Sequence, residues 1–409
     1  DVTTLTMVPN VNTSVSGGTV GCYHIRLGAY GDFSAAKHAA SQYAGGFPAY
    51  VSGKYYAMIG NYQSVSAANS ARVSLGVAGE IFTGSNRCVA VTKTGTTQIL
   101  FEFDAGTSAN LAVRPVNNFG RAVTWFKNYA YYGDFEYYRH VSDRLTVINV
   151  IDIESYVKGI LPYEMSSSWP AEALKAQAVC ARSYTIASLG GYQSYGFDLT
   201  ADTYSQVYYG TNLANANTDA AVDATSGEYV THNGKVCSAF YFSSDGGATE
   251  NSENIFLTAL PYLRGVTDPY EEDVPQSLNG YKSWTRTFSG AALRSKLSSS
   301  GYKGGNVVSI SPAYSENGNV IALTLADASG VSVTLTKSAC YSVIGLPSVR
   351  YSVNAFADSS GSFAFEGSGF GHSVGMSQFG AYSMARFHGL NYRQILRFYY
   401  TGVSISKSV

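Results

Sequence analysis

The feature that most constrains the fold is an alanine-rich helical stretch between residues 170 and 189. Ser168 is in position to act as its N-cap, Pro170 stands at the helix start, and Gly190 and Gly191 end the pattern. Small side chains recur around the whole circumference, at Ala171, Ala173, Ala176, Ala178, Ala181 and Ala187. Such a helix can approach its neighbours closely on every side, so we expect it at the centre of its domain.

The polar residues of this helix fall on two sides. Glu172, Lys175 and Arg182 share one side of a 3.6-residue wheel. Gln177 lies roughly opposite them, on the apolar side, where its amide needs hydrogen-bond partners. We therefore expect a polar contact inside an otherwise apolar helix interface.

A single acid, Glu164, stands just before the helix, after a turn predicted at Pro162 and between Tyr163 and Met165. Aromatic and thioether neighbours can raise the pKa of a carboxyl group, as a general acid that works near neutral pH requires. Taken alone, these neighbours fit a solvated loop carboxylate more often than a catalytic one. The order of the surrounding residues changes that balance.

The stretch from Ile153 to Tyr184 includes Ile-Glu-Ser-Tyr-Val-Lys-Gly-Ile-Leu-Pro-Tyr-Glu-Met and then the alanine-rich helix. It resembles, without gaps, the signature of the SpoIID/LytB family of sporulation lytic transglycosylases and their amidase-enhancer relatives. In that family the glutamate before the methionine is the catalytic acid and base. The resemblance therefore implies that Glu164 is the catalytic residue.

Length and composition restrict the class of protein. The 409 residues suffice for two or three domains, and the net charge of −1 gives no sign of nucleic-acid binding. No apolar run approaches the roughly 20 residues of a membrane span. Because the chain opens at Asp1, we expect a secreted or wall-associated bacterial protein whose signal peptide has been removed.

The five cysteines are widely spaced and form no Cys-x-x-Cys pair. An odd number leaves at least one free thiol. Cys180, inside the alanine-rich helix, is expected to behave as a small buried apolar residue. Cys22 and Cys88 lie at the two ends of one predicted domain, where a disulfide between them is an open alternative.

The N-terminal part begins with a terminal arm, predicted over residues 1–20, and continues with an internal repeat. Residues 23–36 recur as residues 55–68, with a glycine, a tyrosine, a serine and two alanines in register. Each copy predicts a strand, a turn and a helix, the helices opening at Ser34 and Ser66.

Two further strands, at residues 47–51 and 88–91, complete a β-α-β-β-α-β order with both helices on one face of the sheet. Over residues 21–97 this pattern resembles a SPOR domain, a module that binds peptidoglycan glycan strands stripped of their peptides. A small structural α+β domain without a ligand is the alternative.

The rest of the chain, residues 104–409, is predicted to be one strand-rich α+β catalytic domain of the SpoIID type. Alternating apolar and polar residues predict strands up to Ile151. The segment 197–210 is a second landmark of the resemblance, in which Gln206 and Tyr208 match the family.

Zinc ligands are missing from this landmark. Some family members bind zinc there through cysteines and a histidine, whereas Thr200, Tyr204 and Ser205 occupy the matching places here. These side chains do not suit zinc. We therefore predict no metal at this place, and no cofactor for the protein.

Two later blocks resemble family segments that border the active-site cleft. The first contains Ser243 and Ser244, and is followed by Tyr262. The second is a glycine-rich turn at a helix entrance, where His372, Ser377 and Gln378 are expected to take supporting roles. Weakly patterned residues 286–350 are predicted to be peripheral.

The resemblance implies cleavage of the β-1,4 bond between N-acetylmuramic acid and N-acetylglucosamine without water. Glu164 would protonate the glycosidic oxygen and then take the proton of the C6 hydroxyl, which closes a 1,6-anhydro ring. Tyr262 would support the positive charge at the anomeric carbon. The glycan or the wall of the site would be held by Gln177, Arg182, Gln206 and His372.

Two other functions remain open at this point. The first is a non-catalytic glycan-binding enhancer of a cell-wall amidase, which would not need Glu164. The second is hydrolysis by a muramidase, which requires a second carboxylate to position water; Asp202 and Glu250 are candidates. The expected partners are peptidoglycan glycan strands and a cell-wall amidase.

Overall fold

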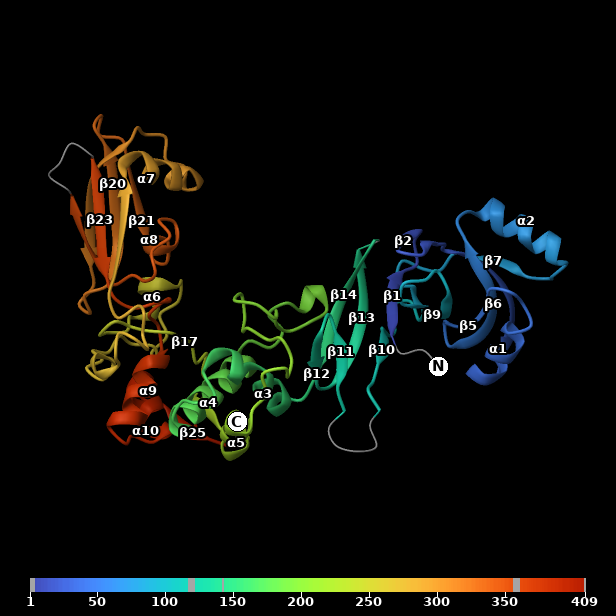
Figure 1. The fold of residues 1–409 in the computed structure, drawn as a ribbon, viewed down its shortest axis with the longest axis horizontal. Helices are drawn as coiled ribbons and strands as arrows, with labels where there is room; N and C mark the ends of the chain where they lie inside the picture. Colours follow the sequence, from blue (N-terminus) through green and yellow to red (C-terminus); the bar gives the residue numbers. More distant parts are fainter. Residues whose placement is uncertain (1–3, 117–121, 142, 356–360, 408–409) are drawn as a thin grey trace. The chain divides into compact units, whose positions relative to one another are not determined.

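The computed structural model describes residues 4–116, 122–141, 143–355 and 361–407, and its fold is α+β. The chain forms two compact units (Figure 1). The first comprises Asp1–Asp152 and Tyr192–Asp198, and the second Ile153–Gly191 and Leu199–Val409. Among the described residues, no helix is both long and apolar enough to cross a membrane.

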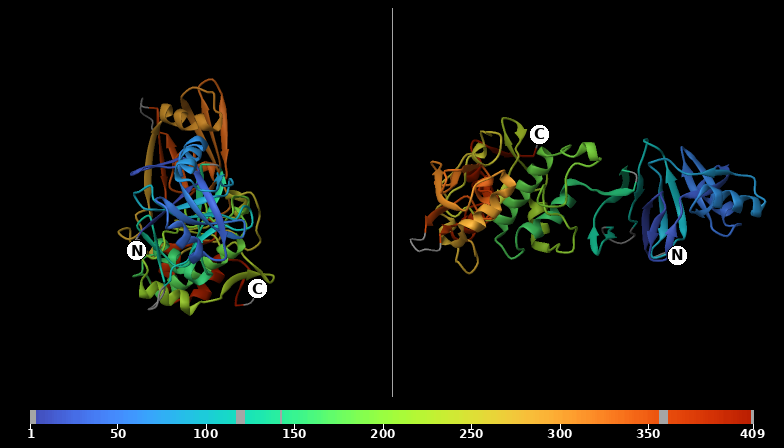
Figure 2. Two further views of the ribbon diagram at one scale, coloured as in Figure 1. Left: turned by 90° about the vertical axis from the view of Figure 1, so that its right-hand side faces the viewer. Right: turned by 90° about the horizontal axis from the view of Figure 1, so that it is seen from above.

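The first unit contains a run of strand, helix, strand, strand, helix and strand. Its elements are β4 (Tyr23–Tyr30), α1 (Phe33–Ala40), β5 (Gly46–Val51), β6 (Lys54–Tyr62), α2 (Val65–Leu75) and β7 (Glu80–Phe82). Both helices pack on β4 and β6 (Figure 2). Their N-caps are Asp32 and Ser64, two residues before the predicted positions, because these side chains accept the amide hydrogens of Ala35 and Ala67.

The last strand of this run differs from the prediction. We expected residues 88–91 to form this strand, but β7 takes that place and pairs with β4. Residues 88–91 fall largely in β8 (Val89–Lys93), which pairs with β1 (Leu5–Pro9) and β9 (Ile99–Asp104). The reason is local, since Gly76 ends α2 in the left-handed region and lets the chain return at once to the sheet. The seven strands lie in the order β1-β8-β9-β5-β6-β4-β7.

The segment expected as a terminal arm is instead folded. Besides β1 it contains β2 (Thr13–Val15) and β3 (Gly18–Val20), which pair with each other. Val8 and Val20 are buried in the same apolar cluster as Phe47 and Met58. Burial of these side chains explains why the segment joins the sheet.

The first unit also extends beyond the predicted boundary at residues 97–104. Its remaining elements are β10 (Leu111–Val113), β11 (Thr124–Phe126), β12 (Tyr129–Tyr131), β13 (Asp134–Val141), β14 (Arg144–Val150) and the short helix η1 (Gln193–Tyr195). Leu111 of β10 is buried with Val89 and Val91 of β8, and Leu145 of β14 packs against them. This shared core joins residues 104–152 to the N-terminal sheet.

The second unit is organised around α4 (Ala171–Ala187), as predicted. Most residues of α4 are buried, and its neighbours are α3 (Ile153–Glu164), α5 (Ala216–Ala224), β15 (Tyr229–His232), α9 (Gln378–Phe387) and α10 (Tyr392–Tyr399). Pro170 precedes the helix without a side-chain cap, so Ser168 does not act as the N-cap. The small circumference of α4 allows this close packing on several sides.

Strands and short helices make up the rest of the second unit (Figure 1). They are β16 (Lys235–Val236), β17 (Tyr241–Phe242), α6 (Ser252–Ile255), η2 (Glu271–Asp273), β18 (Trp284–Ser289), α7 (Gly290–Leu297), η3 (Ser298–Ser300), β19 (Val307–Tyr314), β20 (Val320–Asp327), β21 (Ser332–Thr336), α8 (Ala339–Ser342), β22 (Tyr351–Ala355), β23 (Ser362–Gly367), β24 (Met376–Ser377) and β25 (Ser404–Ser406). Residues 286–350 supply most of β18 and all of β19, β20 and β21 to two three-stranded antiparallel sheets, β18-β23-β22 and β19-β20-β21.

All five cysteines are free thiols. Cys180 is completely buried, as expected. Cys22 and Cys88 do not pair, since the Cys22 thiol faces Asn12 and the Cys88 thiol faces Glu102, at 3.5 and 3.1 Å. The disulfide left open by the sequence is therefore not formed in this structure.

Candidate active site

Glu164 is the last residue of α3, not a loop residue as its sequence neighbours had indicated. Pro162 lies inside this helix and not in a turn before it. The amide of Met165 still donates to the carbonyl oxygen of Leu161 at 3.0 Å, so helical hydrogen bonding continues past the proline. The helix end leaves the Glu164 side chain half-buried.

The Glu164 carboxylate is hydrogen-bonded by three donors. The Nε2 atom of Gln378, the first residue of α9, lies 3.4 Å from a carboxylate oxygen. The Tyr241 hydroxyl and the Val207 amide also donate to it. A separation of 3.4 Å is at the outer limit for a hydrogen bond, so the carboxylate is only weakly restrained by Gln378.

Burial raises the pKa of Glu164 above its ordinary value, although the hydrogen bonds from Tyr241, Gln378 and Val207 act in the opposite direction. The desolvated surroundings disfavour the charged form. The carboxyl group therefore keeps its proton closer to neutral pH than an exposed glutamate does, while partial exposure leaves it accessible.

Tyr241, on β17, connects Glu164 to the interior. Its hydroxyl carries one proton, which it can donate to Glu164 or to the Oε1 atom of Gln206, 3.0 Å away. The Nε2 atom of Gln206 donates to the Thr185 hydroxyl at 2.9 Å. Burial and the nearby negative charge of Glu164 raise the pKa of Tyr241 well above its ordinary value. Tyr241 therefore stays a hydrogen-bond donor at neutral pH.

Gln177 lies within the same group of side chains. It is completely buried in α4, and its Oε1 atom accepts from Gln378 at 3.5 Å. Within the described residues, its Nε2 atom has no hydrogen-bond partner. The amide predicted to need partners is thus only partly satisfied, on the side that faces Gln378.

A short parallel strand pair joins segments that are far apart in the sequence. Tyr241 of β17 is opposite Met376 of β24, and Phe242 is opposite Ser377. The approach requires glycine at position 375, where a Cβ atom would lie 2.1 Å from the carbonyl oxygen of Phe240 and φ is +83°. This pairing brings Tyr241 and Gln378 to the end of α3.

Sequence analysis did not select Tyr241 as a site residue. It stands immediately before the predicted Ser243 and Ser244, in a segment interpreted as an ordinary strand. Ser243 itself is half-buried and accepts the Phe379 amide through its backbone carbonyl at 3.0 Å. The signal that distinguishes Tyr241 is its pairing with β24, which no local pattern reveals.

Arg182 does not join the hydrogen-bond network of Glu164. It is fully buried, and its guanidinium forms a bidentate pair with Glu154, with distances of 3.0 and 2.7 Å. The same group donates to the carbonyl oxygens of Glu228 and Val222. Arg182 therefore joins α4 to α3 and to the segment after α5, which is a structural role.

Tyr208 and Tyr262 also serve packing in this structure. Tyr208 is buried, and its ring lies 4.8 Å from that of Tyr156. The Tyr262 hydroxyl accepts the Ser238 amide at 3.1 Å, and its ring lies 5.7 Å from that of His232.

His372 is surrounded by aromatic rings. The rings of Phe242 and Phe256 lie 5.2 and 5.4 Å away, and the His372 Nδ1 atom accepts the Val374 amide at 3.2 Å. Burial lowers the pKa of His372 to about 4. The imidazole is therefore neutral at physiological pH and cannot supply a positive charge there.

Ser244 and Ser377 belong to a second, fully buried network. Ser377 is the N-cap of α9 and donates to a carboxylate oxygen of Glu271 at 2.7 Å. Ser244 donates to the other oxygen of the same carboxylate. Both serines therefore support the start of α9, directly before Gln378.

Thr200, Tyr204 and Ser205 occupy the places where some family members bind zinc. Their hydrogen bonds lie mainly within their own turn. Thr200 and Ser205 are joined through their hydroxyl groups at 3.1 Å, and Tyr204 is exposed. The absence of zinc remains a prediction.

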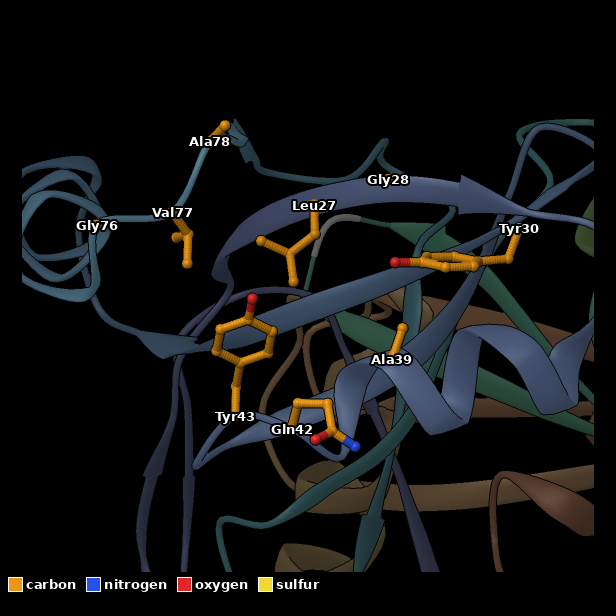
Figure 3. Close-up of a pocket in the computed structure, with 9 residues that line it drawn as sticks. All are labelled: Leu27, Gly28, Tyr30, Ala39, Gln42, Tyr43, Gly76, Val77 and Ala78. Carbon is orange, nitrogen blue, oxygen red and sulfur yellow. The ribbon is translucent and has the colours of Figure 1, made fainter.

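A pocket of about 500 Å³ lies in the first unit (Figure 3). It is lined by β4, the end of α1 with the following turn, and the end of α2, through Leu27, Gly28, Tyr30, Ala39, Gln42, Tyr43, Gly76, Val77 and Ala78. The hydroxyl groups of Tyr30 and Tyr43 turn toward this space (Figure 3). Its lining combines aliphatic side chains such as Leu27 and Val77 with the polar groups of Tyr30, Gln42 and Tyr43.

Comparison with known proteins adds family information. The SpoIID family model, described as stage II sporulation protein, matches residues 141–232. The chain is similar to an uncharacterised protein of Brachyspira hyodysenteriae, with 35% identity over 281 residues, 67% of this chain and 72% of that protein.

Two named proteins of Bacillus subtilis are also similar. Stage II sporulation protein D is 32% identical over 276 residues, which cover 63% of this chain and 75% of that protein. The amidase enhancer is 28% identical over 292 residues, 61% of this chain and 40% of the enhancer. The chain thus spans less than half of the amidase enhancer.

Proposed function

This chain belongs to the SpoIID family, and we propose that it is a lytic transglycosylase of bacterial peptidoglycan with Glu164 as its single general acid and base. The observation that carries the proposal is the state of this carboxyl group, which is half-buried, has a raised pKa and is contacted by Gln378 only at 3.4 Å. A group that must give up and regain a proton needs this combination of access and altered affinity.

The proposed reaction has two proton transfers through one residue. Protonated Glu164 gives its proton to the glycosidic oxygen as the bond to the anomeric carbon breaks. The resulting carboxylate then accepts the proton of the C6 hydroxyl of N-acetylmuramic acid, whose oxygen attacks the anomeric carbon. A 1,6-anhydro ring closes, Glu164 is protonated again, and no water is consumed.

Tyr241 and Gln378 are proposed to position Glu164 and to adjust its proton affinity. Both donate to the carboxylate, so they favour its charged form, which develops when the glycosidic bond breaks. Gln206 holds Tyr241 from the interior at 3.0 Å. Together they limit the rise in pKa that burial alone would produce.

The surroundings of the other candidate carboxylates favour this reaction over hydrolysis. Glu250 is fully buried and accepts hydrogen bonds from Ser315, Asn319 and three further donors, including Asn254 and Asn317. A carboxylate so fully engaged is poorly suited to activate water. Asp202 is exposed and accepts the Thr200 hydroxyl and the Tyr204 amide within its turn.

The activity test uses the full chain and sacculi stripped of peptides by an amidase. We expect Glu164→Gln to reduce release of soluble glycan by at least about 1,000-fold, in the upper range for loss of a general acid. Asp202→Asn is the matched control and should retain activity. Loss of activity in both variants would instead favour a two-carboxylate muramidase, and full activity of Glu164→Gln would eliminate Glu164 as the catalyst.

A non-catalytic enhancer of an amidase is the second candidate, favoured by the name of one relative. Such a protein would bind glycan strands without cleaving them. Stimulation of an amidase by Glu164→Gln as strong as by the unaltered protein, with no glycan product from either, would support the enhancer.

We also propose that the first unit is a SPOR-like module that binds peptide-free glycan and keeps the protein at the bacterial cell wall. The order of elements from β4 to β7 supports this assignment. The pocket in Figure 3 is the proposed contact surface, since Tyr30 and Tyr43 offer both rings and hydroxyl groups to a sugar.

Binding is best tested with the full chain, because a fragment that ended at residue 97 would lack β9, which lies between β8 and β5. In the inactive Glu164→Gln background, we expect Tyr43→Ala to weaken pull-down with stripped sacculi by about tenfold. Tyr195→Ala, at an exposed tyrosine outside the pocket, is the control. Equal binding of intact and stripped sacculi would indicate a general wall anchor, and failure to bind either would remove the SPOR assignment.

A further inference from the structure

A chain of hydrogen bonds runs from the interior of the second unit to Glu164. It begins at the carbonyl oxygen of Ala181 in α4, which accepts the Thr185 hydroxyl at 2.7 Å. The Thr185 oxygen accepts from the Nε2 atom of Gln206 at 2.9 Å, and the Oε1 atom of Gln206 lies 3.0 Å from the Tyr241 hydroxyl. Tyr241 also reaches the Glu164 carboxyl group. Three side chains therefore connect α4 to the proposed catalytic acid.

The amide of Gln206 can face Tyr241 only with its oxygen atom. The Ala181 carbonyl has no proton to give, so its bond to Thr185 uses the single proton of the Thr185 hydroxyl. The Thr185 oxygen is then an acceptor, and the Gln206 atom that faces it must be the amide nitrogen. Gln206 is 2% exposed, so bulk water does not replace these partners. Its Oε1 atom is thus a fixed acceptor for Tyr241.

The Tyr241 hydroxyl has one proton and two acceptors. When Glu164 is charged, its carboxylate is the stronger acceptor, because hydrogen bonds to ionised groups are about twice as strong as neutral ones. When Glu164 is protonated, it can itself donate to the Tyr241 oxygen, and the proton of Tyr241 is then free for Gln206. The two protonation states of Glu164 therefore favour opposite directions of the Tyr241 O–H bond.

The titratable groups recorded beside Tyr241 stay neutral at physiological pH, apart from Glu164. Tyr156 of α3 and Cys180 of α4 lie near it, and burial raises the pKa of both, that of Cys180 to about 12. His372 is hydrogen-bonded to the backbone of Tyr241, and burial lowers the pKa of its imidazole to about 4. Among these neighbours, Glu164 is the one whose protonation can direct the Tyr241 hydroxyl.

We propose that Gln206 is a positioning residue that competes with Glu164 for the proton of Tyr241, so that the Tyr241 hydroxyl turns between them as Glu164 gives up and regains its own proton. While Glu164 is protonated, Tyr241 donates to Gln206. After Glu164 has protonated the glycosidic oxygen, Tyr241 turns to the new carboxylate. No proton leaves Tyr241, since only the direction of its O–H bond changes. The role of this turn in the reaction rests on the proposed function, whereas the competition itself does not.

Gln206 and Tyr241 should therefore shift the proton affinity of Glu164 in opposite directions. The Gln206 oxygen receives the proton of Tyr241 only while Glu164 is protonated, so this acceptor favours the protonated form. Tyr241 favours the carboxylate, because it donates to it. If Gln206 only held Tyr241 in place, its loss would loosen Tyr241 and raise the pKa of Glu164. The sign of the shift thus distinguishes competition from support.

The test measures the pKa of Glu164 in the full chain by NMR of glutamate carboxyl groups labelled with carbon-13. The signal of Glu164 is identified by its loss in Glu164→Gln. Gln206→Met keeps the length of the side chain but removes its oxygen, and it should lower the pKa of Glu164. The expected decrease in proton affinity is up to about tenfold, the scale of one hydrogen bond. Tyr241→Phe should raise the pKa instead.

The double variant shows whether Gln206 acts through Tyr241. In the Tyr241→Phe background, Gln206→Met should change the pKa of Glu164 no further. A raised or unchanged pKa in Gln206→Met, or the same decrease with and without the Tyr241 hydroxyl, would overturn the proposal. Because the measurement needs no substrate, an inactive protein with the expected shifts would keep the competition and remove the proposed function.

Thr185→Val decides if Gln206→Met does not fold. Loss of the Thr185 oxygen frees the Gln206 amide to turn its nitrogen toward Tyr241, so the pKa of Glu164 should again fall. Thr225→Val is the matched control, at another buried threonine, which donates to the Ala221 carbonyl at 2.9 Å, and it should not change this pKa. An unchanged or raised pKa in Thr185→Val would overturn the proposal.

Discussion

Glu164 and Glu271 are two carboxyl groups of the same unit with opposite surroundings. Glu164 is half-buried at a helix end, and its contact with Gln378 measures 3.4 Å. Glu271 is 3% exposed, and hydroxyl, amide and backbone donors engage both of its oxygens. A loosely held carboxyl group can exchange protons with a substrate, whereas a tightly held one fixes the chain around it.

The two groups are connected by two consecutive residues. Ser377 donates to Glu271, and Gln378 contacts Glu164. The rigid network thus sets the position of one of the few donors that reach the reactive carboxyl group. The second network can therefore affect activity without contacting a substrate.

The largest expected effect is the difference in how much the two carboxyl groups contribute to the free energy of unfolding. Glu271→Ala should lower the free energy of unfolding by on the order of 4 kcal/mol, because several buried donors lose their acceptor. Glu164→Ala should lower it by less than about 1 kcal/mol, since the side chain is half-buried and its pKa shows a net cost of burying the charged form. Chemical denaturation of both variants measures the difference.

Equal destabilisation by the two substitutions would contradict the comparison. Glu272→Ala provides the control for Glu271→Ala, because it lies in the same turn but is exposed. Its effect should remain within about 0.5 kcal/mol.

A second, smaller effect concerns the donors of Glu164. Tyr241→Phe removes the hydroxyl between Glu164 and Gln206 while keeping the ring, and we expect a decrease of about 100-fold in kcat on stripped glycan strands. Stability should change by about 1 kcal/mol, the value of one hydrogen bond. Tyr351→Phe, at a buried tyrosine whose hydroxyl donates to the carbonyl oxygen of Cys340, is the matched control.

The pH dependence of activity gives a third test. Because Glu164 must begin protonated, activity should fall as pH rises through its pKa, which burial raises above 4.5. Tyr241→Phe removes a donor that favours the carboxylate, so this limb of the profile should move to higher pH. A shift to lower pH would show that Tyr241 does not stabilise the charged form.

The protonation of Glu164 should also make the stability of the fold depend on pH. The folded-state pKa of Glu164 lies above the unfolded value, so its protonated form contributes stability that is fully present below the unfolded pKa. That contribution is lost as pH rises through the folded pKa. In Glu164→Gln, this part of the pH dependence of Tm should disappear, whereas Asp202→Asn should retain it.

The sequence predicted the features that depend on local pattern. The alanine content of residues 170–189 placed α4 at the centre, and the position of Glu164 before Met165 made it the candidate acid.

Other features depend on contacts between distant segments. The meeting of Tyr241 with Gln378 results from parallel pairing of two-residue strands, which leave no periodic signal. Arg182 was expected to hold the glycan or the wall of the site, but Glu154, 28 positions earlier, pairs with it in the interior. The shared core of β8 and β10 likewise extends the first unit past residue 104.

The most direct test of the proposed reaction is whether oxygen from water enters the cleaved glycan ends. Peptide-stripped glycan strands are digested with the full chain in water enriched in oxygen-18, and the products are analysed by mass spectrometry. We predict 1,6-anhydro-N-acetylmuramic acid ends that carry no oxygen-18, and no such products with Glu164→Gln. Reducing ends that carry oxygen-18 would show hydrolysis and contradict the single-carboxylate mechanism.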